Sequence, residues 1–282
     1  MALGTDQMTG TTLANFRPTV WSKEALVARE STLVMVPRIK HYDRDIKSFG
    51  QTIDIPNVSN LTAHQKVANT QVVLNAPTEG HTLISINQHY ETSFLLEDFA
   101  DAQSIIDAAS EYTAKTGYAM AEVMDTTVVT ELTSNAAKSA GAYGTALNDT
   151  TILVANRYLD DAKAPSTGRT LAVTPQGKQE MLAIDKYVRY DALGTGSAIV
   201  NGKIGTIYDL EVVMSHNLKV TAGTPTQNNN LLFHKEACAI AVQKDIKFES
   251  QRKTEYLGTL YVSQALWGVK ILRADNVVVV KD

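Results

Sequence analysis

The order of hydrophobic and polar positions indicates one long helix in this chain, within residues 95–140. Apolar and small side chains there recur at steps of three and four residues, which places them along one face of an α-helix. Carboxylates suit the start of a helix and a lysine suits its end, so we expect the helix to run from Asp101 to Lys138. At 1.5 Å per residue it would be about 55 Å long. Gly117 is its weak point, and the alternative is an ordinary buried helix that is shorter.

Two stretches before this helix have strand-like patterns but contain few large apolar residues. They span residues 33–55 and 64–74. A two-stranded ribbon alone is only marginally stable in water, so we expect residues 37–77 to form a long polar hairpin that lies on a partner. A further strand, within residues 81–96, leads directly into the helix.

The N-terminal residues 1–16 are rich in Thr and Gly and show no periodicity. We expect them to be an arm that is disordered unless something holds it. An amphipathic piece follows Pro18 and places Trp21 on its apolar face. Trp21 either docks on another surface or packs on the core of its own chain.

The pattern after the helix changes to alternating helices and strands. Residues 152–165 predict a helix that ends before Pro165, and residues 169–174 predict a short buried strand. A second helix is expected to begin at Pro175 with Thr174 as its N-cap, because proline is favoured in the first turn and a threonine oxygen can accept from the free amides there.

Residues 187–200 contain Gly and Ser and are expected to form a loop. Asn201 and Gly202 are the strongest hairpin signal in the chain, because this dipeptide favours the two-residue turns between antiparallel strands. Strands are expected within residues 203–218. Residues 221–230 look like a polar linker, and residues 231–282 alternate like strands that return to the sheet beside the long helix.

Composition narrows the classes of function. The chain has 282 residues, a formal net charge of −4 and one cysteine, Cys238. The net charge argues against a protein whose main task is to grip nucleic acid. The single cysteine excludes an intrachain disulfide and fits a reducing compartment. We expect no secretory signal and no transmembrane helix, and therefore no membrane partner.

A search for catalytic and metal-binding motifs is negative. The chain lacks a GxxxxGK[ST] phosphate loop, a GxSxG nucleophile elbow and an HExxH zinc motif. His81 and His89 are too far apart to chelate one ion. We therefore expect no catalytic residues, no metal and no cofactor. A soluble α/β enzyme with unrecognised catalytic residues is the alternative from another functional class.

The order and sizes of these segments resemble the major capsid protein of tailed bacteriophages, which has the Hong Kong 97 fold. The pieces that carry the resemblance are PTVWSKEALVARE, the hairpin region after VPRI, the helix sequence ending AEVMDTTVVTEL, GKIGTIYDLEVVMSHNL and the terminal stretch from HKEACAIAVQ to ILRADNVVVV. Together they cover nearly the whole chain.

The resemblance implies an α+β fold with four parts. Residues 1–36 would be an N-terminal arm and residues 37–80 an extended β-hairpin loop. Residues 81–148 and 229–282 would form a peripheral domain that contains the long spine helix. Residues 149–228 would form an inserted α/β axial domain.

The same resemblance implies a structural protein and not an enzyme. It would self-assemble as hexamers and pentamers of an icosahedral shell that encloses double-stranded DNA without sequence-specific binding. Its location would be the virion capsid, assembled in the host cytoplasm. Separate scaffolding, portal and decoration proteins would be its other partners. The alternative within the fold is an encapsulin-like nanocompartment that packages an enzyme.

Two sets of residues are expected to lie at contacts between subunits. In the first, the basic first strand of the hairpin meets the acidic start of the helix on an adjacent subunit. The inter-subunit candidates are Trp21, Arg38, Lys40, Arg44, Lys47, Glu97, Asp98, Asp101 and Asp107. The second set lies in a flexible loop near the capsomer centre and comprises Tyr190, Gly194, Gly196 and Ser197.

Overall fold

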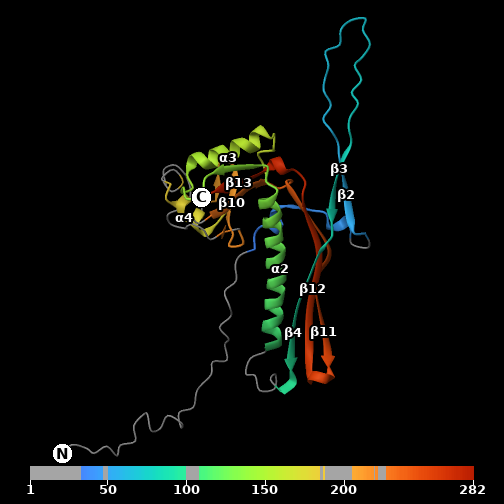
Figure 1. Cartoon of the computed structure of the whole chain (residues 1–282), viewed down its shortest axis with the longest axis vertical. Helices are drawn as coiled ribbons and strands as arrows, with labels where there is room; N and C mark the ends of the chain where they lie inside the picture. The colour runs from blue at the N-terminus through green and yellow to red at the C-terminus, as the bar shows by residue number, and fades with distance from the viewer. Residues whose placement is uncertain are drawn as a thin grey trace, which may run out of the picture.

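The computed structural model describes residues 33–46, 50–99, 108–184, 187, 205–218, 220–221 and 227–282. The described residues form an α+β structure. Figure 1 shows helix α2 lying along the long strands β4, β11 and β12, with a second sheet and helices α3 and α4 beside its C-terminal end. The hairpin of β2 and β3 extends away from both parts.

Helix α2 (Ala108–Ser134) confirms the predicted long helix. Its apolar face contains Met120, Met124, Val128 and Leu132, which recur every four residues and are buried in one core. The predicted end is wrong. Lys138 begins strand β5 (Lys138–Gly141), whose backbone pairs in parallel with β13 (Val277–Lys281) and so is satisfied by a sheet instead of a helix.

Gly117 is explained by packing. A Cβ atom at this position would lie 3.3 Å from Cζ of Phe248 on β11. That distance is tighter than an ordinary van der Waals contact, so the glycine allows the strand and the helix to approach each other. The helix propensity lost at Gly117, about 1 kcal/mol, is offset by this close packing.

A four-stranded sheet lies against α2. Its strands in spatial order are β1 (Lys40–His41), β11 (Cys238–Lys253), β12 (Gly258–Ile271) and β4 (Gln88–Glu97). Phe94 on β4 contacts Tyr112 on α2, with ring centroids 5.6 Å apart, and Tyr90 stacks on Trp267 at 5.1 Å. The C-terminal strands therefore return beside the long helix, as predicted.

The hairpin is shorter than its sequence pattern suggested. Strands β2 (Thr52–Asn57) and β3 (Gly80–Ser85) pair antiparallel, and the pairing stops at Asn57 and Gly80. The strand expected within residues 64–74 does not form. The two limbs of residues 58–79 are instead linked by side-chain hydrogen bonds. The stretch expected as one strand in residues 33–55 is interrupted by the 3-10 turns η2 (Val36–Arg38) and η3 (Asp43–Asp45).

The second sheet has both faces covered. Its main path is β5, β13, β10 (Gln227–His234), β6 (Arg169–Val173), β8 (Leu210–Met214) and β7 (Thr206–Ile207), with β9 (Val220–Thr221) paired to β10. Leu231 and Phe233 join the core of α2, whereas Leu232 faces the core that contains α3 and α4. All five residues of β6 are buried, which confirms the predicted short buried strand.

The two predicted helices of this part form, although the first begins at Asp149 and not at Ile152. Helix α3 (Asp149–Asp161) ends before Pro165. Helix α4 (Pro175–Leu182) starts at a proline, and Thr174 Oγ1 accepts from the N–H of Gly177 at 3.0 Å.

The prediction of a linker over residues 221–230 is wrong for its second half, which belongs to strand β10. Asn228, Asn229 and Asn230 are buried in strand β10. Two of their side-chain oxygens accept hydrogen bonds inside the chain: Asn230 Oδ1 accepts from the N–H of Thr174 at 2.7 Å, and Asn229 Oδ1 accepts from the hydroxyl of Tyr143 at 2.8 Å. The sheet also takes β5 and β13 from outside residues 149–228, so the inserted segment does not form this sheet alone.

The hairpin of β7 and β8 turns at Tyr208 and Asp209, which have φ values of 50° and 63°. Two positive φ values are typical of the turns that join antiparallel strands. The expected turn at Asn201 and Gly202 lies outside the described residues.

Candidate inter-subunit surfaces

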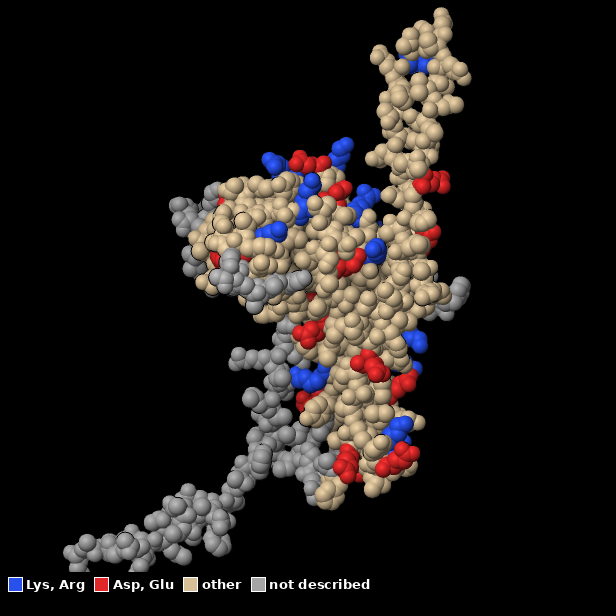
Figure 2. Space-filling model, viewed as in Figure 1, with Lys and Arg blue, Asp and Glu red and all other residues tan. Residues whose placement is uncertain are grey.

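The segment between β2 and β3, residues 58–79, extends beyond the body of the molecule and is called the hairpin excursion below (Figure 1). Figure 2 shows this part as largely uncharged. Its exposed aliphatic residues are Val58, Leu61, Val67, Val72, Val73 and Leu74, each at least 59% exposed. Covering exposed apolar surface of this kind with another protein surface is favourable, because it removes the apolar side chains from water.

Side chains hold the shape of the hairpin excursion. His64 Nε2 and Asn75 Oδ1 are hydrogen-bonded across the two limbs at 3.0 Å, and Asn75 Nδ2 donates to the carbonyl oxygen of Thr62 at 2.8 Å. Near the tip, Lys66 Nζ donates to the carbonyl oxygen of Val67 at 2.8 Å. The excursion is thus a shaped loop with its aliphatic side chains turned to solvent.

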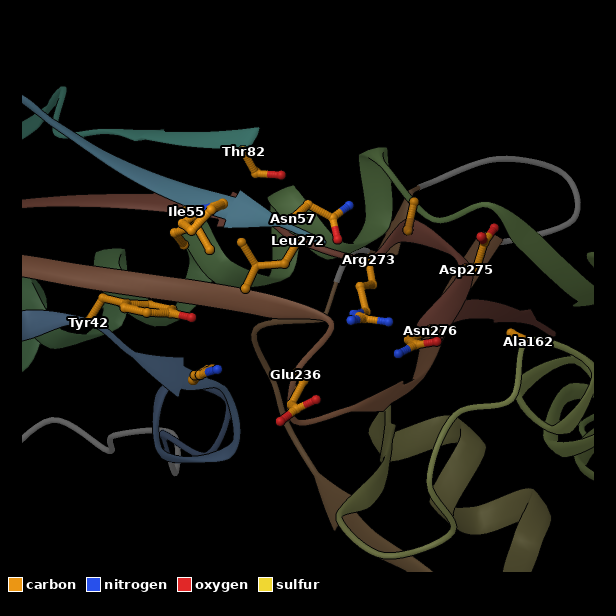
Figure 3. Close-up of a pocket in the computed structure, with 13 residues that line it drawn as sticks. Tyr42, Ile55, Asn57, Thr82, Ala162, Glu236, Leu272, Arg273, Asp275 and Asn276 are labelled. Carbon is orange, nitrogen blue, oxygen red and sulfur yellow. The ribbon is translucent and has the colours of Figure 1, made fainter. Parts of the chain in front are cut away.

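A hollow of about 570 Å³ lies where the hairpin joins the rest of the chain (Figure 3). Its lining contains two basic residues, Lys40 and Arg273, and two acidic residues, Glu236 and Asp275. A hydrogen bond with the Tyr42 side chain, more than the nearby Glu236, raises the pKa of Lys40. This polar, mixed-charge lining differs from the apolar enclosure typical of small-molecule sites.

Two of the expected inter-subunit charges are engaged inside the chain. Arg38 Nη2 lies 2.5 Å from Glu211 Oε1 on β8. Arg252 donates through both terminal nitrogens to the two carboxylate oxygens of Asp98, and this contact lowers the pKa of Asp98. The sequence could not show these pairings, because each joins residues more than 150 positions apart.

The remaining candidates fall into two groups. Arg44 and Glu97 are exposed, and Lys40 lines the hollow at the hairpin root. The candidates outside the described residues are Trp21, Lys47, Asp101, Asp107, Tyr190, Gly194, Gly196 and Ser197.

The flanks of the predicted capsomer-centre loop are held together. Tyr187 and Tyr208 both donate their hydroxyls to Asp149 Oδ1 at the start of α3, at 2.6 Å and 2.7 Å. Burial, followed by the hydrogen bond to Asp149, raises the pKa of Tyr187. These two hydrogen bonds hold Tyr187 and Tyr208, which lie on either side of residues 188–204, at one carboxylate. No sequence signal identified it, because the three residues are 38 and 59 positions apart.

A second exposed apolar patch was also missed. It lies at the far end of the four-stranded sheet, where β4 ends and β11 turns into β12 (Figure 1). Leu95, Phe99, Tyr256 and Leu257 are exposed there. The N–H of Asp98 donates to the carbonyl oxygen of Leu257 at 3.0 Å, which ties the turn to the end of β4.

The buried carboxyl group of Asp282 lies near the partly buried Glu180 of α4. Asp282 is only 3% exposed and continues the face of β13 that carries Val278 and Val280. Burial raises the pKa of Asp282 to about 6, and Glu180 on α4 adds to the rise. Glu180 Oε2 itself accepts from the N–H of Leu147 at 2.6 Å. Asp282 therefore holds a proton more readily than an exposed aspartate would.

The described residues show no cluster of three or more His, Cys, Asp or Glu side chains placed to hold a metal ion. Cys238 is buried, and burial raises the pKa of its thiol to about 12. Because the thiolate is the reactive form, this cysteine is a packing residue. No helix within the described ranges is both long and apolar enough to cross a membrane.

Comparison with solved structures identifies the fold. A chain from Mycobacterium phage Che8 is 24% identical, with a TM-score of 0.83 over 94% of this chain and 97% of that chain. The capsid structure of cyanophage P-SCSP1u is 21% identical, with a TM-score of 0.79 over 99% and 96% of the two chains. The head structure of Helicobacter pylori bacteriophage KHP40 is 13% identical, with a TM-score of 0.74 over 99% of each.

These matches confirm the expected α+β, Hong Kong 97-like capsid fold. A search of curated proteins finds no match. The sequence model of the phage capsid protein family matches residues 44–280, which is most of the chain. The chain therefore belongs to the phage capsid protein family.

Proposed function

We propose that this major capsid protein assembles as hexamers and pentamers into a closed icosahedral shell that encloses double-stranded DNA. The family supports a structural role in the virion capsid and assembly with copies of itself. Assembly would take place in the host cytoplasm. Scaffolding, portal and decoration proteins would be the further partners.

The hairpin excursion is the observation that carries this proposal. Six aliphatic side chains stand in solvent on a segment that makes no core of its own. A monomer gains nothing from this arrangement, whereas a neighbouring copy can bury it. The gain at one contact is small, but it is repeated at every subunit boundary of a closed shell.

The charge of the chain suits an enclosing role. A net charge of −4 supplies no general attraction to the phosphates of a packaged genome. The shell would therefore contain DNA by closure, without sequence-specific binding. A container that does not grip its contents can also release them.

Particle formation and content test the proposal. We expect the expressed chain to sediment as large particles and to show shells by negative-stain microscopy, alone or with a scaffolding protein. Particles from phage-producing cells should protect double-stranded DNA from nuclease. A chain that stays monomeric under all these conditions would contradict the shell, and particles that contain a cargo enzyme and no DNA would indicate the encapsulin-like alternative.

A further inference from the structure

Asp125 lies near the middle of α2 and is completely buried. Burying a carboxylate is unfavourable unless hydrogen bonds replace the lost water. Asp125 Oδ1 accepts from the backbone N–H groups of Met35 at 2.8 Å and Val36 at 3.1 Å, and Oδ2 accepts from Asn217 Nδ2 at 3.1 Å. The donors are 90, 89 and 92 residues away along the chain, so this carboxylate joins distant segments.

The two backbone donors belong to the start of the turn η2. The first amides of a helical turn have no partner inside it, and the side chain just before the turn commonly supplies one. Met35 occupies that position, but its side chain carries no oxygen, and η2 has no side-chain cap from its flanking residue. Asp125, on another element, therefore supplies the acceptor for the two free amides at the start of this turn.

The same turn is tied to the second sheet. Arg38 in η2 pairs with Glu211 on β8, and Asn217 lies shortly after the end of β8. Met35 and Leu218 are buried in the same core as α2. The carboxylate thus lies where the N-terminal segment, the long helix and the second sheet meet.

We infer that Asp125 is a positioning residue that anchors residues 33–38 to α2 and so fixes where the N-terminal arm expected from the sequence joins the body of the subunit. The anchor itself is independent of assembly. Its consequence rests on the proposed function, because an arm that contacts neighbours must leave every copy from the same place.

Trypsin cleavage of the full-length subunit, kept below the concentration at which it assembles, tests the anchor. The bond after Arg38 lies in the anchored segment, and the bond after Arg169 lies in the buried strand β6. We expect Asp125→Ala to speed cleavage after Arg38 by about tenfold or more, since one buried and one partly buried amide lose their acceptor, while cleavage after Arg169 stays unchanged. An unchanged rate after Arg38, or equal acceleration at both bonds, would overturn the anchor.

The matched controls keep the size of the side chain. In Asp125→Asn, Oδ1 still accepts the two backbone N–H groups, but Nδ2 faces the donor on Asn217. Asn217→Asp in the same chain restores an acceptor there. We expect this double variant to be cleaved after Arg38 within about twofold of the wild-type rate, because paired changes at contacting residues compensate. Cleavage as fast as in Asp125→Ala would refute the hydrogen-bonding role.

An assembly assay then tests the consequence separately. We expect Asp125→Ala to yield few shells and the Asp125→Asn, Asn217→Asp double variant to yield shells as the wild type does. Wild-type yield from Asp125→Ala, together with fast cleavage after Arg38, would show that the anchor exists but does not serve assembly. If the wild type forms no shells, the proposed function fails while the cleavage result still decides the anchor.

Discussion

The seven-stranded sheet and the hairpin excursion differ in the burial of their side chains. In the sheet, even the polar residues Asn229 and Asn230 are buried and hydrogen-bonded inside the chain. In the excursion, aliphatic residues are exposed on both limbs, for example Leu61 on the first and Leu74 on the second. The sheet is stabilised within one subunit, whereas the excursion keeps apolar surface that a neighbouring subunit could bury. Substitutions should therefore separate folding from assembly.

The largest expected effect on folding comes from the sheet. Phe233 is fully buried between the sheet and α2. Phe233→Ala removes apolar contacts and leaves a cavity, so we expect the free energy of unfolding to fall by about 3–5 kcal/mol. Chemical denaturation followed by circular dichroism measures it. A loss below about 1 kcal/mol would mean that this core does not hold the subunit together.

A smaller effect on folding depends on pH. The pKa of Asp282 is about 6 in the folded subunit and about 3.9 in an unfolded chain. Its contribution is most favourable below about pH 4 and is lost as the pH rises through 6, because ionisation is then penalised only in the fold. Asp282→Asn should therefore raise the free energy of unfolding by about 1–3 kcal/mol at pH 7.5 and leave it nearly unchanged at pH 4.

Thermal and chemical unfolding of Asp282→Asn between pH 4 and pH 8 checks this sign. Asp275→Asn is the matched control, because Asp275 is exposed. The difference between wild type and variant should grow with pH for Asp282 and stay flat for Asp275. A variant that is less stable than the wild type at pH 7.5 would contradict the buried, penalised carboxylate.

Substitutions in the hairpin excursion should have almost no effect on folding and a large effect on assembly. The combined changes Val72→Ser, Val73→Ser and Leu74→Ser replace exposed aliphatic side chains, so we expect the free energy of unfolding to change by no more than about 0.5 kcal/mol. Shell formation should be lost at concentrations that suffice for the wild type, as seen by sedimentation. Val72→Ile with Val73→Ile keeps the apolar surface and should still form shells. If the serine variant forms normal shells, the excursion is not part of the interface between subunits.

The smallest expected effect concerns the charges of Arg44 and Lys47. An exposed ion pair contributes about 0–1 kcal/mol, so reversing Arg44 and Lys47 to Glu should leave folding unchanged and weaken assembly, more strongly at low salt, where screening is weaker. Light scattering at several salt concentrations measures the shift. Partial rescue by Glu97→Lys would identify the acidic partner surface, since Asp98 is already held by Arg252. Equal assembly at every salt concentration would rule out this contact.

Local patterns along the chain were enough to predict several elements. The recurrence of apolar and small residues at steps of three and four, which includes Met120, identified α2, and Thr174 before Pro175 identified the start of α4. These predictions succeeded because helix periodicity and capping depend on residues within a few positions of each other. The end of α2 and the burial of Asn230 could not be predicted in this way. Both depend on pairing with β13, a strand far away in the sequence, which pairs with Lys138 in β5 and with Asn230 in β10.

The sequence by itself determined where the long helix lies, the order of the segments and the absence of known catalytic motifs, because all three are local patterns. The tertiary structure alone decided which charges remain available for a neighbour, since Arg38 and Asp98 are neutralised by residues more than 150 positions away. It also decided the role of Asp125, whose sequence position on a helix resembles any other acidic residue. Folding brings it to two amides whose own turn supplies no cap, and burial makes that hydrogen bonding necessary.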